Sequence, residues 1–331
     1  MIAMRSFLNP EGYHGVKSKA PFFEGWYYKC VDEAGENSLA LIPGISLHRE
    51  PERDHAFIQI LDGSSGRSLY HRVPAEQFCA DPRGLEQRLG ASRFSRRGLA
   101  LDIEAEGWQL NGEIDFGPFI PWPVTLRSPG AMGWYAWVPF MECYHGVVSF
   151  SHELKGSVLF NGREIDFTGG RGYIEKDWGR SFPQAYVWLQ SNHFAAPGTS
   201  FMASVAIIPW LRGAFPGFII GLNHLHHLYR FATYTGAQVE ALEIGDAEIL
   251  LQVRDRHHRL HIRAERAKAG LLHAPTLQGM TNRIAETLGG TISLRLEETT
   301  GREIILEQTG GHAGIDAAGD LGKLQEMARQ D

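Results

Sequence analysis

Cysteine is scarce in this sequence, and its copies form no pattern. Cys30, Cys79 and Cys143 are far apart, odd in number, and none belongs to a CxxC pair. A disulfide framework needs paired cysteines and a zinc ribbon needs closely spaced ones, so we expect neither. Residues 1–15 lack a basic segment followed by an apolar run, which indicates a cytoplasmic protein without a secretory signal.

An excess of positive charge is also missing. The chain has 32 Lys and Arg against 38 Asp and Glu, a formal net charge of -6. A chain without a basic surplus has no overall field that would draw it onto nucleic acid. We therefore expect no nucleic-acid partner.

No uninterrupted apolar run is long enough for a membrane helix. The nearest stretch, Phe201–Leu222, is broken by Pro209, Arg212 and Pro216. An arginine at the bilayer centre costs roughly 2.5 to 3.5 kcal/mol even on a lenient insertion scale. We expect two apolar strands joined at Trp210–Ala214, with an edge suited to peripheral contact with a membrane.

Common catalytic and cofactor motifs are absent as well. There is no Gly-x-Ser-x-Gly elbow and no HExxH, and the glycines at 169–172 have neither the spacing nor the following helix of a phosphate loop. We expect no organic cofactor and no metal. Two histidines, His224 and His226, would share a strand face, but a surface or loop position explains them better than a metal site.

What the sequence does contain is period-two alternation in short segments separated by Gly, Pro, Asn and Asp. This pattern is typical of an all-β sandwich or barrel. Helical spacing is found at Thr276–Leu288 and in the tail, Asp320–Arg329. The expected strands are Gly25–Val31, Ser38–Leu47, His55–Leu61, Leu99–Glu106, Gly146–Phe150, Gly156–Phe160, Ala185–Phe194, Phe201–Ile208, Phe218–Leu222, Tyr229–Tyr234, Ala247–Asp255, Arg259–Glu265, Gly290–Glu297 and Glu303–Gln308.

Two segments that resemble each other, FFEGWYYK at 22–29 and IEKDWGRS at 174–181, each place an acid just before a Gly or Trp at the start of a series of strands. We expect two β-barrel or sandwich halves, residues 12–168 and 169–319, followed by a helical tail at 320–331.

Carboxylates among aromatic residues are the main candidates for chemistry. In an extended Tyr173–Trp178 segment, Tyr173, Glu175 and Asp177 share one face, and the two acids stand about 7 Å apart. Burial of that face would raise at least one pKa and keep a neutral proton donor. The alternative is a structural network in which Lys176 or Arg180 pairs with a carboxylate and Trp178 closes a barrel end.

Two further segments offer acids and bases. Glu24 shares an expected strand face with Trp26 and Tyr28, where Trp26 suits a packing plug and the role of Glu24 stays open. Glu142 and His145 are spaced for a coupled acid and base. His145 and His152 lie an odd number of residues apart and would face opposite ways in one continuous strand.

Taken together, several segments resemble the tocopherol cyclase family in its bacterial branch, over about Gly12–Gly319. These segments are GYHG (12–15), FFEGWYYK (22–29), PFMECYHGVVSFSH (139–152), GYIEKDWGRSFPQAYVWLQSNHF (172–194), LHAPTLQGM (272–280) and RIAETL (283–288). The resemblance implies a pair of lipocalin-like β-barrels, distantly similar to carotenoid hydratases, and chemistry on prenyl chains.

The chemistry so implied is protonation of a trisubstituted alkene, followed by capture of the tertiary cation by a phenol oxygen or by water. We expect Asp177 as proton donor and Glu175 as its electrostatic partner, with Glu24, Glu142 and His145 as second choices. The residues expected to line the substrate are Tyr173, Trp178, Trp188, Trp26, Tyr28, Tyr144 and Asn192. The expected partner is a small hydrophobic ligand, a prenyl quinol or another isoprenoid.

Two other functions fit the composition. A barrel that carries a hydrophobic ligand without changing it would explain the aromatic content. A sugar-binding sandwich is less consistent, because the aromatic residues adjoin apolar segments. A carrier gains nothing from buried carboxylates, so the acid pair discriminates between the enzyme and the carrier.

Overall fold

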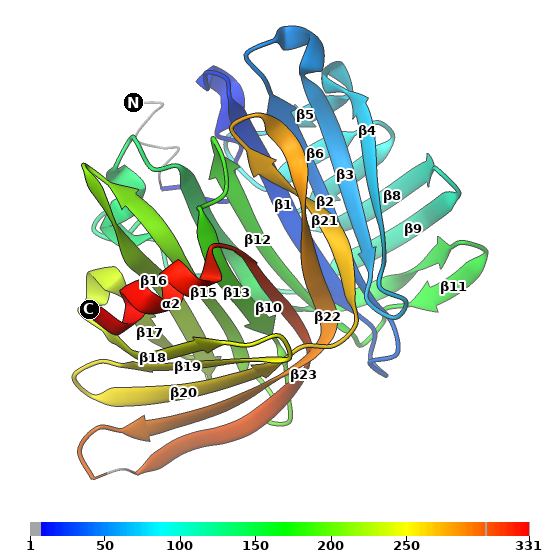
Figure 1. Cartoon of the computed structure of the whole chain (residues 1–331). Helices are drawn as coiled ribbons and strands as arrows, with labels where there is room; N and C mark the ends of the chain where they lie inside the picture. Colours follow the sequence, from blue (N-terminus) through cyan, green and yellow to red (C-terminus); the bar gives the residue numbers. More distant parts are fainter. Residues whose placement is uncertain (1–7, 302, 331) are drawn as a thin grey trace. The chain divides into compact units, whose positions relative to one another are not determined.

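The computed structural model describes residues 8–301 and 303–330, and most of them lie in antiparallel strands (Figure 1). The first seven residues, on which part of the expectation about a secretory signal rests, lie outside this range. The chain forms two compact units: unit 1 is Met1–Phe182 with Leu271–Arg283, and unit 2 is Pro183–Gly270 with Ile284–Asp331. The expected boundary at 168/169 thus differs from this division, which falls after Phe182.

Unit 1 is one antiparallel sheet in the order β4-β3-β2-β1-β12-β10-β9-β8-β7-β6-β5, with β11 paired to β10. Its short 3-10 helices are η1 (Gly15–Lys17), η2 (Pro51–Arg53), η3 (Ala75–Gln77) and η4 (Gly133–Trp137). Its strands are β1 (Phe22–Val31), β2 (Ser38–Leu47), β3 (His55–Asp62), β4 (Arg67–Pro74), β5 (Phe78–Ala80), β6 (Glu86–Leu89), β7 (Ser92–Ser95), β8 (Gly98–Ala105), β9 (Trp108–Phe116), β10 (Cys143–Phe160), β11 (Arg163–Asp166) and β12 (Arg171–Gly179).

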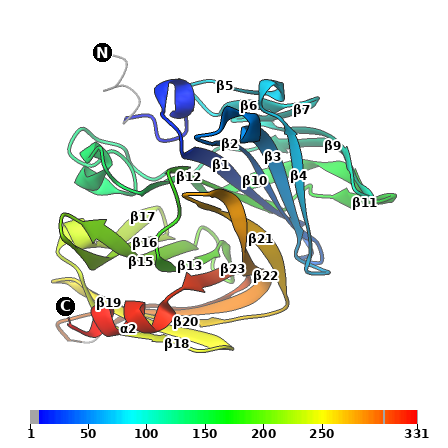
Figure 2. The same ribbon diagram turned by 45° about the horizontal axis from the view of Figure 1, so that its top comes forward.

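The second antiparallel sheet has the order β17-β16-β15-β13-β23-β22-β20-β19-β18, with β14 paired to β23 and β21 paired to β22. Its strands lie in unit 2, except that residues 271–283, from β21 and the start of β22, belong to unit 1. Figure 2 shows β21 running beside the long strand β22. The elements are β13 (Ala185–Ser191), β14 (His193–Phe194), β15 (Ser200–Trp210), β16 (Gly213–His224), β17 (His227–Ala232), η5 (Thr233–Thr235), β18 (Gln238–Ile244), β19 (Glu248–Arg254), β20 (His258–Glu265), β21 (Ala269–Thr276), β22 (Gly279–Glu298), β23 (Ile304–Gly319) and α2 (Leu321–Gln330). The expected all-β fold of two lipocalin-like halves is confirmed.

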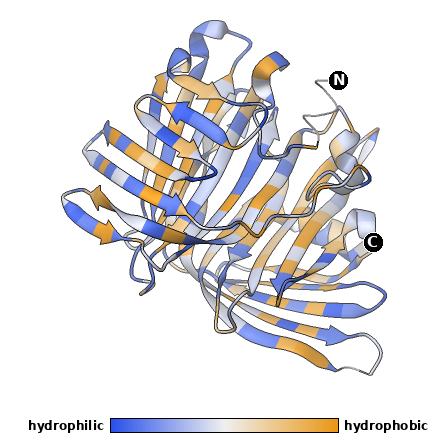
Figure 3. Ribbon diagram, turned by 180° about the vertical axis from the view of Figure 1, so that it is seen from behind, coloured by the Kyte–Doolittle hydropathy of each residue, from blue (hydrophilic) through white to orange (hydrophobic). Residues whose placement is uncertain are grey.

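Each unit has its own hydrophobic core, made by alternate residues of its strands. Hydrophilic and hydrophobic residues alternate along many strands in Figure 3. Trp26, Leu41, Phe94 and Ile174 are among the buried residues of unit 1, and Val187 is among those of unit 2. Because successive side chains of a strand point to opposite faces, the residues between these positions form a second face on each sheet.

A tight turn shows how local sequence fixes strand pairing. Asn161 and Gly162 link β10 to β11, and both have positive φ angles, 50° and 81°. A two-residue hairpin with two positive φ angles is the type I′ turn, for which Asn-Gly is the preferred sequence. This turn is one of the Asn- and Gly-containing separators between strands that the sequence pattern predicts.

The helical interpretation of Thr276–Leu288 is wrong, whereas that of the tail is confirmed by α2. Thr276 ends β21, and Gly279 begins β22 with a φ of 117°. A Cβ atom at Gly279 would lie 2.2 Å from the His48 ring. Only glycine tolerates both conditions, so the segment turns back as a hairpin.

The apolar stretch Phe201–Leu222 forms β15 and β16, which pair through a turn after Trp210, as the sequence indicated. Over the described part of the chain, no helix is both long and apolar enough to cross a bilayer.

Candidate functional site

The acids of the EKDW segment lie on β12, in the middle of the sheet of unit 1. Tyr173, Glu175 and Asp177 share one face of this strand, as expected, because Ile174 on the other face belongs to the hydrophobic core. On neighbouring β10, His145 lies directly opposite Asp177. On β1, Tyr27 lies directly opposite Glu175. Strand pairing therefore gathers acidic, imidazole and phenol groups on one face.

His145 connects the two carboxylates. Its Nδ1 lies 2.9 Å from Oδ1 of Asp177, and its Nε2 lies 3.5 Å from Oε2 of Glu175. Burial disfavours a charged imidazole, but the two carboxylates and the hydrogen bond to Asp177 outweigh it and raise the pKa of His145 from 6.5 to about 9. At neutral pH the ring is an imidazolium that donates to Asp177. We call His145, Glu175 and Asp177 the acid cluster.

Glu175 is the more deeply buried acid of the cluster. Its side chain is 6% exposed, and its Oε2 accepts a hydrogen bond of 2.5 Å from the hydroxyl of Tyr173. Burial, together with this carboxylate, raises the pKa of Tyr173 well above its usual value, so the phenol stays protonated. Tyr173 thereby fixes the position of Glu175.

Asp177 is the more open acid, with 25% of its side chain exposed. The Cys143 thiol lies 3.9 Å from its Oδ1, and burial holds the pKa of that thiol well above the usual value. Asp177 is thus the member of the cluster that a ligand could approach from solvent.

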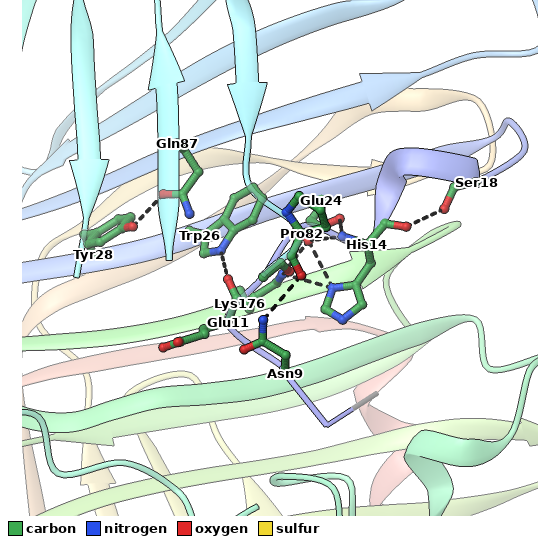
Figure 4. Close-up of polar contacts among 11 residues, drawn as sticks. Asn9, Glu11, His14, Ser18, Glu24, Trp26, Tyr28, Pro82, Gln87 and Lys176 are labelled. Atoms are coloured by element: carbon green, nitrogen blue, oxygen red, sulfur yellow. Dashed lines mark hydrogen bonds and ion pairs between the residues drawn. The ribbon is translucent and has the colours of Figure 1, made fainter. Parts of the chain in front are cut away.

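The opposite face of the same strands carries a different polar network (Figure 4). Glu24 and Lys176 are both fully buried and form an ion pair. The backbone N–H of His14 donates to Oε2 of Glu24 at 2.9 Å, and Lys176 also donates to the Gly12 carbonyl at 2.5 Å. Burial opposes ionisation of Glu24, yet the Lys176 ammonium and His14 hold the pKa of Glu24 below its usual value. An ionised carboxylate in this position is a structural partner and a poor proton donor.

Aromatic rings enclose that ion pair. The Lys176 Nζ lies 4.4 Å from the ring centre of Trp26 and 4.9 Å from that of Trp178, both within cation–π range. Tyr28 is buried and donates a 2.7 Å hydrogen bond to Gln87. Trp26 therefore packs as the sequence suggested, and Trp178 already contacts a cation on the face away from the acid cluster.

The other candidate residues of unit 1 do not belong to the acid cluster. Tyr144 stacks on Trp178 at 5.5 Å between ring centres, and its hydroxyl donates to the Val138 carbonyl. Glu142 lies just before β10, and His145 pairs with Asp177 and Glu175 instead of with it. His152 packs against Phe116 and Phe119, where burial lowers its pKa to about 3.

Two expected substrate-lining residues belong to unit 2. Trp188 is buried in β13, and Asn192 follows that strand, with its Oδ1 2.8 Å from Nδ1 of His193. Both residues therefore lie in unit 2, whereas the acid cluster lies in unit 1.

The acid cluster contains side chains of the kinds that bind metal ions. Among the described residues, His145, Glu175 and Asp177 are a group whose ligand atoms lie within 4.8 Å of one another. Each ring nitrogen of His145 faces a different carboxylate, however, which suits a hydrogen-bonded imidazolium better than a chelate around one nitrogen. His224 and His226 do not share a strand face, because Leu225 and His226 form a turn with positive φ angles.

Sequence reasoning missed Tyr27 and the link between His145 and Asp177. Tyr27 lies on the face of β1 opposite to Trp26 and Tyr28, a placement that the alternation alone gives. Its position beside Glu175 depends on the pairing of β1 with β12, which joins residues about 150 positions apart. No local signal specifies that register.

Comparison with known proteins points to one family. The family described as tocopherol cyclase-like is matched by residues 91–319. The chain is 28% identical to the chloroplastic tocopherol cyclase of Zea mays, with 95% of this chain and 78% of the relative covered. It is 26% identical to a probable chloroplastic tocopherol cyclase of Oryza sativa, with 93% and 77% covered.

Two solved structures share the fold at low identity. A crystal structure of CghA with Sch210972 has a TM-score of 0.56 at 10% identity, covering 91% of this chain and 89% of the other. A putative AttH from Nitrosomonas europaea also has a TM-score of 0.56, at 14% identity, covering 93% and 94%. At such low identity, these two similarities show that the fold is shared and say nothing about function. The family match extends over more than half of the sequence, and on that ground this chain belongs to the tocopherol cyclase-like family.

Proposed function

We propose that this protein adds an oxygen nucleophile to an alkene of a prenyl lipid by acid catalysis, either closing a ring onto a phenol or hydrating the double bond. The observation that carries the proposal is the acid cluster, in which His145 is held between the buried Glu175 and the partly exposed Asp177, in a chain of the tocopherol cyclase-like family. The names of the maize and rice relatives favour ring closure over hydration.

Substrate binding would prepare the acid. An apolar ligand over Asp177 removes the water that reaches its side chain, and a low-dielectric site favours neutral partners over an ion pair. The Nδ1 proton of His145 then moves to Asp177, along the existing 2.9 Å hydrogen bond. Asp177 becomes a carboxylic acid directed at the ligand.

Proton transfer and capture complete the reaction. The Asp177 proton forms a C–H bond with the less substituted alkene carbon, and the π electrons form that bond, which leaves a tertiary cation. The regenerated carboxylate and Glu175 stabilise the cation electrostatically. A phenol or water oxygen forms the C–O bond, and the proton it loses returns to Nδ1 of His145. The steps balance as an isomerisation or as an addition of water, without an oxidant or reductant.

Tyr27 and Tyr173 supply the aromatic surface on this face. Tyr173 is fully buried and Tyr27 is 8% exposed, and both flank Glu175, across the strand pair and along β12 respectively. Ring faces stabilise a nearby positive charge. This role replaces the one expected of Trp178, which contacts Lys176 on the other face.

The carrier function is the alternative, and turnover separates the two. The test supplies a prenylated hydroquinone and measures chromanol formation by mass spectrometry. We expect Asp177→Asn to lower turnover by a factor of about 100 or more, the usual contribution of a positioned acid, with ligand affinity and melting temperature nearly unchanged. Asp102→Asn, at an exposed position of β8, is the control.

The results of these turnover and binding measurements distinguish an enzyme from a carrier. Binding without turnover in the wild type would support a carrier. A large loss of stability in Asp177→Asn, accompanied by normal turnover of the folded fraction, would return the residue to a structural role.

A further inference from the structure

A hairpin from late in the sequence is fastened to the rest of unit 1 by side chains. We call residues 271–280, most of β21 and the first residues of β22, the strap. Ser68 Oγ donates to the Leu271 carbonyl at 2.7 Å, and the Arg53 guanidinium donates to the Gln278 carbonyl at 2.8 Å. β21 itself pairs with β22. Single side-chain bonds of this kind open locally more readily than a strand ladder does.

The strap lies over the face of unit 1 that carries the acid cluster. Gln59 and Tyr70 are directly opposed on β3 and β4 and so share one face, whereas Ile58, beside Gln59, belongs to the core. Gln59 bonds to the backbone of His273, and the His273 ring stacks on Tyr70 at 4.2 Å between centres. The acid cluster is also on the face away from the core, since Ile174 between its acids is a core residue. The strap therefore covers the β3–β4 end of that face.

Two buried histidines lie beneath the strap. His48 follows β2 and His55 begins β3, each is 6% exposed, and their rings stack at 5.5 Å between centres. The His48 ring lies against Gly279, where a Cβ atom would approach it to 2.2 Å. His55 bonds to Tyr70, on which His273 stacks. The strap thus depends on both rings, on one through Gly279 and on the other through Tyr70.

The hydrogen bonds of His55 fit a neutral ring. Its Nδ1 lies 2.9 Å from the Arg53 carbonyl, which can only accept, so Nδ1 carries a proton. Its Nε2 lies 2.7 Å from the Tyr70 hydroxyl and accepts the proton of that hydroxyl. A second proton on the ring would remove this acceptor and force the Tyr70 hydroxyl to turn. Protonation therefore disturbs the residue on which the strap stacks.

The charges around the two rings also oppose protonation. Burial, Arg53 and Arg72 lower the pKa of His48 below its usual 6.5, and burial with Arg72 lowers that of His55. Both rings are therefore neutral at pH 7.5. The charged and titratable groups that face them are Glu50, Arg53 and Asp54 in the loop between β2 and β3, Tyr70 and Arg72 on β4, and His273 on the strap.

We propose that acid releases the strap from unit 1, through protonation of His48 and His55, and so opens the β3–β4 end of the face that bears the acid cluster. A buried imidazolium needs water or a counter-charge, and lifting the strap admits water to both rings. The neutral rings stabilise the closed strap fully above pH 6.5, and this contribution is lost as the pH falls further. Release takes place whether or not the acid cluster catalyses a reaction.

The test is hydrogen exchange of the full chain at pH 7.5 and pH 5.0, with mass spectrometry of the peptide 271–280 and correction for the intrinsic pH dependence of exchange. A group with a pKa of 6.5 in the open state favours opening at pH 5.0 by up to about thirtyfold. We expect the strap to open at least tenfold more at pH 5.0. Strands β8 and β9, which contain no histidine, should keep their protection.

Variants assign the effect to the two rings. The double variant His48→Gln, His55→Gln should lose most of the pH dependence, whereas His226→Gln, in the exposed turn between β16 and β17, should keep it. Gly279→Ala should open the strap already at pH 7.5, because its Cβ would meet the His48 ring. Three results would each overturn the proposal: equal protection of the wild-type strap at both pH values, an equal loss of protection in β8 and β9, or an unchanged pH dependence in the double variant.

Discussion

At the scale of single residues, His145 determines the charge of the acid cluster. Two carboxylates on one strand face would repel each other, and the imidazolium between them removes that repulsion. Its raised pKa is a property of the folded state. The cluster therefore contributes most to stability below the unfolded pKa of about 6.5, and that contribution is lost as the pH rises through about 9.

The first prediction concerns this titration. Without the Asp177 carboxylate, both the charge and the hydrogen bond that hold the proton on His145 are lost, while burial still disfavours it. The pKa of His145 should therefore fall by more than one unit in Asp177→Asn. Histidine-labelled NMR over pH 5–10 measures it, with His145→Gln to assign the signal. A pKa that stays near 9 in Asp177→Asn would refute the cluster.

A second prediction concerns Asp316. Its folded pKa of about 7 exceeds the unfolded value of 3.8, so between these pH values the native state binds more protons. Its contribution to stability is full below about 3.8 and is lost as the pH rises towards 7. The melting temperature of Asp316→Asn should depend less on pH over this window than that of the wild type, as scanning calorimetry can show. Parallel curves would rule out the raised pKa.

At the scale of elements, β12 has a different role on each face. The sequence predicts which residues share a face of β12, because a strand has a fixed period of two. Tyr173, Glu175 and Asp177 lie on one face, and Ile174 and Lys176 lie on the other. The residues that these side chains contact cannot be predicted from the sequence. Lys176 pairs with Glu24 across about 150 residues, and His145 reaches Asp177 across 32. Such contacts depend on non-local strand register.

The third prediction tests the face with Lys176. Removing one member of a buried ion pair leaves an uncompensated charge, at a cost of about 3–5 kcal/mol. Glu24→Gln should lose about that much free energy of unfolding in urea titrations. The double variant Glu24→Gln, Lys176→Met should recover much of it, since both charges are then gone. If the double variant is as unstable as the sum of the single variants, the pair does not act as described.

The misassigned helix shows where local patterns fail. The residues Leu277, Met280, Ile284 and Leu288 have helical spacing, but Leu277 is 51% exposed, whereas Met280 and Leu288 are buried. A backbone turn at Gly279 beside His48 overrides the spacing. By contrast, α2 follows its local pattern, and most expected strands were correct because their turns carry Gly, Asn or Asp.

At the scale of the whole molecule, the chain passes between its two units three times, after residues 182, 270 and 283. The segment 271–283 belongs to unit 1, where Gln59 exchanges hydrogen bonds of 3.0 and 2.7 Å with the backbone of His273. The Phe182 N–H donates to the Pro275 carbonyl at 3.0 Å. Unit 1 is therefore completed by a late part of the sequence.

The fourth prediction follows from this connectivity. A fragment of residues 8–168 lacks β12, so β1 and β10 lose the strand between them and expose unpaired edges. It should aggregate or stay unfolded by circular dichroism and size exclusion. A fragment of residues 8–182 joined by a Gly-Ser linker to 271–283 should instead fold. A well-folded 8–168 fragment would contradict the division into units.

The central claim is that the acid cluster delivers a proton from solvent to an alkene carbon. The most direct measurement is turnover of a prenylated hydroquinone in D₂O, with mass spectrometry and NMR of the product. If the acid cluster protonates the alkene, the product carries one non-exchangeable deuterium, on the ring carbon next to the new C–O centre, and Asp177→Asn forms much less product. A product without deuterium at that carbon, or full turnover in Asp177→Asn, would contradict it.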